Sequence, residues 1–123
     1  MKIAITIARL LLGLVFVVFG VNGFVTFLAV PEFAGDAGAF MGILKGSGYL
    51  LVVKALEVIG GVLLLVGRVP AGLLVLGPVV VNILLFHVLL DSAGPSLVVS
   101  IIVTLLEVFL IVVHWDRFKQ IFV

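Results

Sequence analysis

The sequence has no cysteine and few charged residues, and each shortage removes a class of chemistry. Without cysteine, the 123-residue chain cannot form a disulfide, a thiolate metal site or an iron–sulfur cluster, and it cannot exchange disulfides. Charged residues make up 11% of the chain, well below the about 25% of typical soluble domains. The net charge is only +1 and there is no long basic run, which argues against a nucleic-acid partner.

The chain instead has an excess of apolar residues. Hydrophobic residues account for 65% of the sequence, and the mean hydropathy is +1.58. These values predict that a lipid bilayer is the solvent. A helical crossing needs about 20 residues, so the length leaves room for four crossings and for no separate soluble domain. We therefore predict an all-α membrane protein with a single transmembrane domain over residues 1–123.

Proline, glycine and charged residues separate four apolar runs. We expect crossings at about 3–30, 49–66, 70–90 and 96–114. Pro31 follows the first run, and the turn formed by residues 91–95 precedes the last. Residues 33–45, between the first two crossings, fit a short interfacial helix. Pro78 predicts a kink in the third crossing.

The distribution of lysine and arginine predicts the orientation of the chain. One side of the expected bundle carries Lys2, Arg68, Arg117 and Lys119, whereas the other has Lys45 among acidic residues. Cytoplasmic loops of membrane proteins are enriched in lysine and arginine. We therefore expect an antiparallel four-helix bundle with both termini in the cytoplasm.

Two charged residues lie inside the second expected crossing. Lys54 and Glu57, called the charged pair below, are three residues apart and project from one helical face. A charge at membrane depth costs about 2.5–3.5 kcal/mol even on lenient insertion scales. Apolar packing would not require these residues, so the charged pair is the first candidate for a functional site.

Other polar residues are expected at a similar depth. Counting about 1.5 Å per helical residue places Asn22, Asn82 and His87 in the same outer half of the membrane as the charged pair. The two asparagines suit either hydrogen bonds between helices or contacts to a ligand. Gly61 and Phe86 are candidates for the wall of a ligand pocket.

The inner half of the membrane has its own candidate pair. Arg9 in the first crossing and Glu107 in the fourth are matched in depth, which predicts a structural ion pair between these helices. His87 is spaced to interact with Asp91 four residues later. His87 and His114 fall at opposite membrane surfaces, so one chain cannot place both on a haem iron or on another metal ion. We predict no metal site.

Several segments together carry a resemblance to a known family. They are RLLLG at 9–13, FGVNGF at 19–24, GY at 48–49, KALEVIGG at 54–61, GPVVVNILLFH at 77–87 and WDR at 115–117. In their order and spacing these segments resemble the DoxX family of small four-helix membrane proteins. That family takes its name from a subunit linked to thiosulfate:quinone oxidoreductase, and some members are associated with oxidative-stress or sulfur redox complexes. The resemblance implies the plasma (inner) membrane of a bacterium or archaeon.

Two functional classes, with a third in reserve, follow from these residues. The first is a quinone-interacting or redox-associated membrane subunit, working with redox partner subunits. In it Lys54, His87 or Asn82 would hydrogen-bond a quinone carbonyl and Glu57 would carry the coupled proton. The second is a permease or binding protein for a small polar solute, acting as a homo-oligomer with Lys54 as the anion contact. The third is a structural subunit whose polar groups only fix the helix register.

Overall fold

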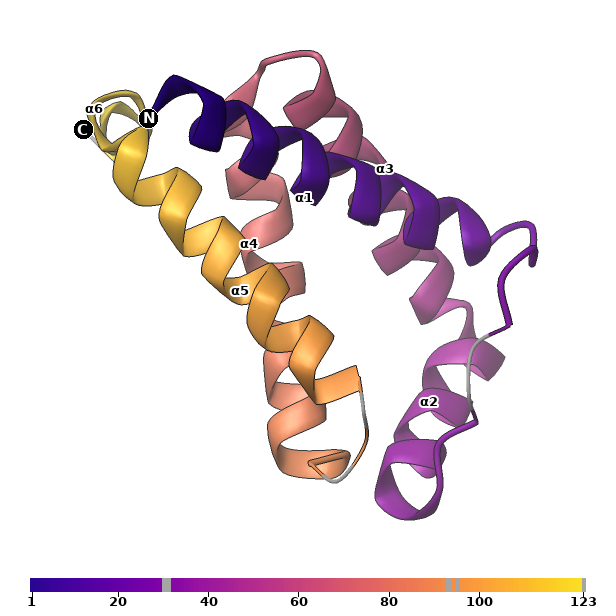
Figure 1. Ribbon diagram of the computed structural model, residues 1–123. Helices are drawn as coiled ribbons and strands as arrows, with labels where there is room; N and C mark the ends of the chain where they lie inside the picture. The colour runs from indigo at the N-terminus through magenta and orange to yellow at the C-terminus, as the bar shows by residue number, and fades with distance from the viewer. Residues whose placement is uncertain (30–31, 93, 95, 123) are drawn as a thin grey trace.

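The computed structural model describes residues 1–29, 32–92, 94 and 96–122, and within these ranges it is helical without strands. The elements are α1 (Lys2–Asn22), α2 (Gly35–Ser47), α3 (Tyr49–Leu65), α4 (Val69–Leu85), the π-helical turn η1 (Phe86–Leu90), α5 (Ser96–Val113), α6 (Trp115–Phe118) and the 3-10 turn η2 (Lys119–Phe122). Figure 1 shows their order along the chain. The predicted first run and loops include four residues that lie outside the described ranges: Val30, Pro31, Ala93 and Pro95.

The long helices pack in the order α1, α3, α4 and α5, and α5 returns to contact α1. Both chain termini lie at one end of the molecule (Figure 1). From that end α1 and α5 diverge, so that the α1–α3 pair and the α4–α5 pair separate toward the other end. There α2 and η1 make contact with each other across the gap between the two pairs.

Glycines allow the helices to approach closely. A Cβ atom on Gly61 of α3 would lie 2.7 Å from the carbonyl oxygen of Gly13 on α1. Gly72 of α4 is equally confined, because its Cβ would lie 3.0 Å from the Leu64 side chain and 3.1 Å from the carbonyl oxygen of Gly60. Transmembrane helices often use small residues in this way, since bringing backbones together maximises van der Waals contact.

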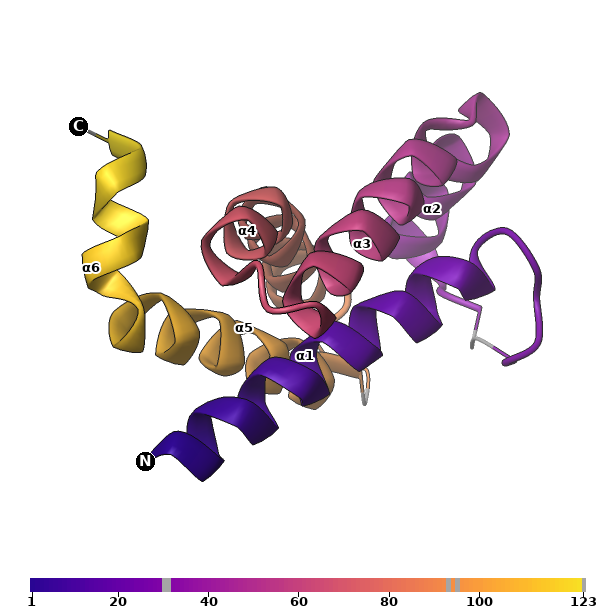
Figure 2. The same cartoon turned by 90° about the horizontal axis from the view of Figure 1, so that it is seen from above.

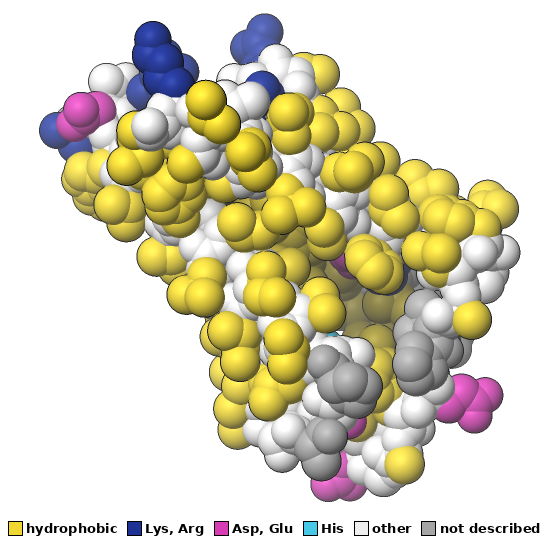
Figure 3. Space-filling model, in the orientation of Figure 1, with side chains coloured by type: hydrophobic (Ala, Val, Ile, Leu, Met, Phe, Trp, Pro, Cys, Tyr) yellow, Lys and Arg dark blue, Asp and Glu magenta, His cyan; other side chains and the backbone are white. Residues whose placement is uncertain are grey.

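The molecule has a thin apolar core and a largely apolar exterior. The most deeply buried large side chains are leucines: Leu12, Leu64, Leu73, Leu76 and Leu110. Large hydrophobic residues are also exposed along the long helices (Figure 3). Such an exterior needs an apolar solvent, since soluble proteins rarely expose contiguous apolar patches of this kind. The fold is therefore suited to a lipid bilayer.

Several of the helices are long and apolar enough to cross a membrane. Three described spans qualify: Lys2–Asn22, Val69–Leu90 and Ser96–Val113. The pair formed by α2 and α3 is bent by 86° and makes a fourth if it is counted as one span. The chain thus has the features of a multi-pass membrane protein.

Two elements differ from what the apolar runs predict. The first helix ends at Asn22 rather than near residue 30. The Asn22 side chain explains this end, because its Oδ1 accepts hydrogen bonds from the backbone N–H groups of Phe27 (2.9 Å) and Leu28 (2.8 Å). The third run continues as a helix through Pro78, where a kink stays a prediction, and its winding changes to a π-helical turn at η1.

The glycine contact between α1 and α3 predicts unequal costs for two similar substitutions. Gly61→Ala should destabilise the protein by about 1–3 kcal/mol, because the new methyl group meets the α1 backbone, which cannot move as a side chain can. Gly77→Ala is the matched control, since nothing lies within 4 Å of a Cβ on Gly77 and alanine favours a helix. Unfolding in detergent measures both; equal stability of the two variants would contradict close packing at Gly61.

Candidate functional site

The charged pair forms an ion pair on α3, as its spacing predicts. Lys54 Nζ lies 3.4 Å from Glu57 Oε2 and 3.5 Å from Oε1. The Glu57 side chain is 5% exposed and the Lys54 side chain 22% exposed. Glu57 is therefore held inside the protein, while the lysine retains some contact with its surroundings. These are the only charged side chains on α3.

The C-terminal end of α1, with the glycine that follows it, holds Lys54 in place. A Cβ on Gly23 would collide with the aliphatic stem of Lys54, so the stem passes directly over this glycine. Gly20, one turn earlier, lies against the backbone of α3, since its Cβ would be 3.0 Å from the Lys54 carbonyl oxygen. The two glycines thus let α1 cover the stem and leave the ammonium group to Glu57.

Four aromatic rings, called the aromatic cluster, gather where α2 and η1 meet. Phe86 is the centre: its ring centroid lies 5.0 Å from Phe33, 5.8 Å from Phe40 and 5.0 Å from His87. The Phe33 and His87 rings meet Phe86 edge to face, which is the favoured geometry for aromatic pairs. The aromatic cluster joins α2 and the loop before it to η1.

His87 has a charged neighbour in η1. Its Nδ1 lies 3.5 Å from Asp91 Oδ2, as the four-residue spacing predicts. This distance is too long for a good hydrogen bond, so the two side chains attract each other only when the ring is protonated. The π-helical turn is closed by the backbone N–H of Asp91, which donates to the carbonyl oxygen of Phe86 (3.1 Å). Such turns often mark functional sites.

The surface is hollowed between α5 on one side and α1 and α3 on the other. Figure 3 shows this hollow, with apolar side chains along the part of its rim that the described residues form, and small patches of acidic, basic and histidine atoms inside it. Of the two histidines in the chain, His87 belongs to η1, whereas His114 directly precedes α6 at the end that carries the termini. The hollow combines an apolar rim with a small number of polar groups, as ligand sites commonly do.

The other residues predicted for the site make their contacts elsewhere in the structure. Asn22 is buried, but its side-chain amide is engaged by the loop after α1. Asn82 is exposed, and its Nδ2 donates to the carbonyl oxygen of Pro78 on the same helix (2.8 Å). Gly61 is used in the contact with α1, and Phe86 is enclosed by the aromatic cluster. Neither asparagine therefore joins the charged pair in the structure.

The predicted ion pair between Arg9 and Glu107 is wrong. Arg9 Nη1 instead donates to the carbonyl oxygens of Leu64 (2.7 Å) and Leu65 (3.1 Å), at the end of α3. The last carbonyl groups of a helix have no partner within the helix, so they attract a nearby guanidinium. Glu107 is 3% exposed, and within the described part of the chain neither carboxyl oxygen has a hydrogen-bond partner.

Sequence reasoning missed the aromatic residues contributed by the segment between the first two long helices. Phe33 and Phe40 reach η1 only because α2 folds back at 86° to α3. The one available signal was the Gly46-Ser47-Gly48 break that allows this bend, with Gly48 at φ 81°. In the described ranges, no group of three or more histidine, aspartate or glutamate side chains could hold a metal ion.

The burial of Glu57 predicts that replacing Lys54 alone lowers the stability of the protein more than replacing both residues of the charged pair. Lys54→Met should cost about 1–3 kcal/mol, because it leaves a buried carboxylate without its partner. The double variant Lys54→Met/Glu57→Leu should recover much of that loss, because no charge then remains buried. Unfolding of the two variants in the same detergent measures the difference. A double variant less stable than Lys54→Met would contradict this account.

The separate partners of Arg9 and Glu107 predict additive substitutions. Arg9→Met should destabilise the protein, because the carbonyl oxygens of Leu64 and Leu65 at the end of α3 lose the hydrogen bonds from the guanidinium group. Glu107→Leu should be neutral or stabilising, because it removes an unpartnered buried carboxyl group. Independent sites add to within about 0.5 kcal/mol. A coupling energy well above that value in a double-mutant cycle would contradict separate partners and would support an ion pair between Arg9 and Glu107.

We compared the chain with protein-family models, with curated proteins and with solved structures, and none of them matched. The resemblance to the DoxX family therefore rests on the quoted segments alone. The chemistry of the site has to be argued from the charged pair, the aromatic cluster and the hollow.

Proposed function

We propose that the chain is a DoxX-like, quinone-interacting or redox-associated membrane subunit, and that the hollow receives the quinone. The observation that carries this proposal is the buried Lys54–Glu57 ion pair on the helix that borders an apolar-rimmed hollow. A charged pair in such a place is expensive, and at membrane depth ionisable residues mark ligand or proton sites by default.

The donors of the charged pair suit a quinone. An ammonium group has three N–H donors, and the contacts of Lys54 with Glu57 leave donor capacity for a carbonyl oxygen. Glu57 is the adjacent group that can hold or release a proton when a quinone becomes a quinol. His87 on η1, next to Asp91, offers a second group that can exchange a proton. Asn82 has no part in this proposal, because its side chain is exposed on α4.

The apolar rim suits the rest of such a molecule. A quinone with a hydrocarbon tail is dissolved in the bilayer and has to enter a protein sideways. A hollow that opens between α1 and α5 offers such an entrance, since these helices diverge away from the termini (Figure 1). Phe40 of the aromatic cluster, packed against the buried Phe86, exposes an apolar surface at the same end of the molecule.

We further propose four crossings, with both termini in the cytoplasm. Lysine and arginine gather at the end that carries the termini, and the opposite end is acidic (Figure 3). Positive residues favour the cytoplasmic side. In this arrangement α3 crosses the membrane and α2, at 86° to it, lies along the outer surface. The site then belongs to the outer half, where redox partner subunits or a second copy of the chain would have access.

The partial exposure of Lys54 favours one other function. The Lys54 side chain is 22% exposed, and its ammonium group would then bind a small anion in place of a quinone carbonyl. The chain would then be a permease or binding protein, and a bundle this small would act as a homo-oligomer. Uptake of anions into proteoliposomes that depends on Lys54, by a protein that contains no quinone, would favour this second function.

The proposal predicts a ligand in the purified protein. Organic extraction and mass spectrometry should recover a quinone from the wild type, and Lys54→Met and Glu57→Gln should lower its occupancy severalfold. Glu107→Gln is the matched control, because it makes the same chemical change in another buried carboxyl group of the bundle. Circular dichroism should establish that all variants are folded.

Two outcomes would count against the proposal. A folded wild-type protein that carries no quinone, and that takes none up from quinone-containing vesicles, would contradict it. An equal loss of quinone in Glu57→Gln and Glu107→Gln would place the ligand elsewhere.

A further inference from the structure

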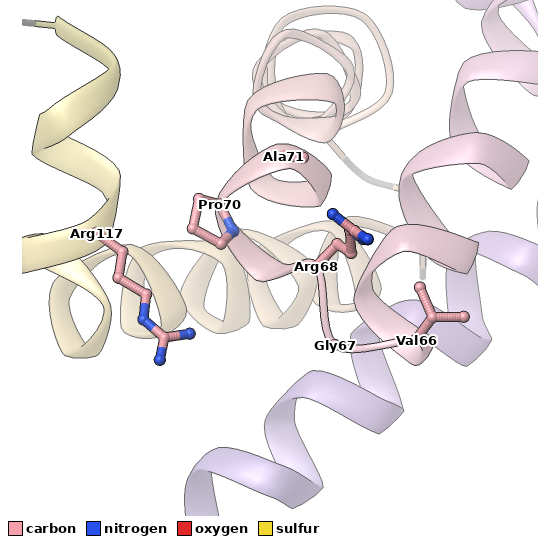
Figure 4. Close-up of a pocket in the computed structure, with 6 residues that line it drawn as sticks. All are labelled: Val66, Gly67, Arg68, Pro70, Ala71 and Arg117. Atoms are coloured by element: carbon pink, nitrogen blue, oxygen red, sulfur yellow. The ribbon is translucent and has the colours of Figure 1, made fainter.

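A basic cavity lies at the end of the molecule that carries the termini. It is a shallow depression, open to the surface, with a volume of about 460 Å³. The lining residues come from the turn between α3 and α4, from the start of α4 and from α6: Val66, Gly67, Arg68, Pro70, Ala71 and Arg117. In Figure 4 the Arg117 side chain extends from α6 toward this turn, and Arg68 lies on the other side of Pro70.

The two arginines of the cavity have no acidic partner in the described part of the chain. The ion pairs found there join Lys54 to Glu57, His87 to Asp91 and Lys119 to Asp116. Arg9 is also at this end, but its guanidinium is engaged by the carbonyl groups that end α3. The cavity is thus lined by two guanidinium groups, one on each side of Pro70, that no carboxylate of the described residues neutralises. An anion is the ligand that such a cavity favours.

The cavity also lies where a helix bundle meets the surface of the bilayer. Its floor is the turn between two apolar helices, and its side is the segment that follows the apolar helix α5. That segment, α6 with η2, turns away from α5 and extends to one side of α4 (Figure 2). Its exposed Trp115 and Phe122 are aromatic residues of the kind enriched at the membrane surface.

We propose that this cavity binds the phosphate group of an anionic phospholipid through Arg68 and Arg117. Guanidinium groups match the oxygens of a phosphate in geometry and charge. Basic cavities between helices at the membrane surface are suited to anionic headgroups. The acyl chains would extend along the exposed apolar side chains of α4 and α5. The site is separate from the hollow and does not depend on the proposed quinone function.

Trp115 gives the experiment a local signal, because it is the only tryptophan in the chain and lies two residues from Arg117. The full chain in a neutral detergent would be titrated with short-chain phosphatidylglycerol while tryptophan emission is recorded. Phosphatidylcholine and inorganic phosphate form separate arms. We expect a saturable change with phosphatidylglycerol and none with the other two at the same concentrations. Equally tight binding of inorganic phosphate would overturn the assignment to a lipid.

A pair of double variants with equal charge loss tests the site itself. Arg68→Gln/Arg117→Gln should weaken binding of phosphatidylglycerol about thirtyfold, from the attraction that each basic residue contributes at a membrane surface. Lys2→Gln/Lys119→Gln removes the same charge at the same end of the molecule and should weaken it about threefold at most. Circular dichroism verifies the fold of each variant. Equal weakening in the two double variants would show general attraction to the basic end and would overturn the proposal.

Discussion

The structure depends on the close contact of α1 with α3. Where Gly13 meets Gly61, the two backbones approach to a distance that no larger residue permits. The same alignment brings Gly20 of α1, and Gly23 directly after it, over Lys54. The lysine stem is thereby fixed, and its ammonium group remains with Glu57. Without this contact α1 would not cover the Lys54 stem, and the ammonium group would not be held beside Glu57.

The functional proposal follows from where the helices stop packing. α1 and α3 remain together along their length, as do α4 and α5, but the two pairs separate toward the end where α2 and η1 meet. The charged pair lies on α3, and the aromatic cluster spans from η1 to α2. The hollow between the pairs therefore offers an apolar molecule both a lateral entrance and polar groups. The opposite end is closed around leucines and presents basic residues at its surface.

The sequence predicted what depends on local spacing and missed what depends on the direction of a side chain. Lys54–Glu57 and His87–Asp91 could be predicted because three- and four-residue offsets on a helix bring side chains together. The partner of Arg9 could not be predicted, because its depth matched that of Glu107, whereas its acceptors in the structure are carbonyl oxygens at the end of α3. The end of α1 was missed although Asn22-Gly23 is a turn signal, since apolar residues continue beyond it.

The central claim is that the hollow beside the charged pair takes a quinone from the bilayer. A photoreactive azidoquinone, activated with the protein in vesicles, tests this directly when the labelled peptides are identified by mass spectrometry. The account predicts labels on α3 near Lys54 and on η1 near His87, both suppressed by an excess of unmodified quinone. Labels spread evenly over the lipid-facing residues of all helices, and unaffected by that excess, would contradict it.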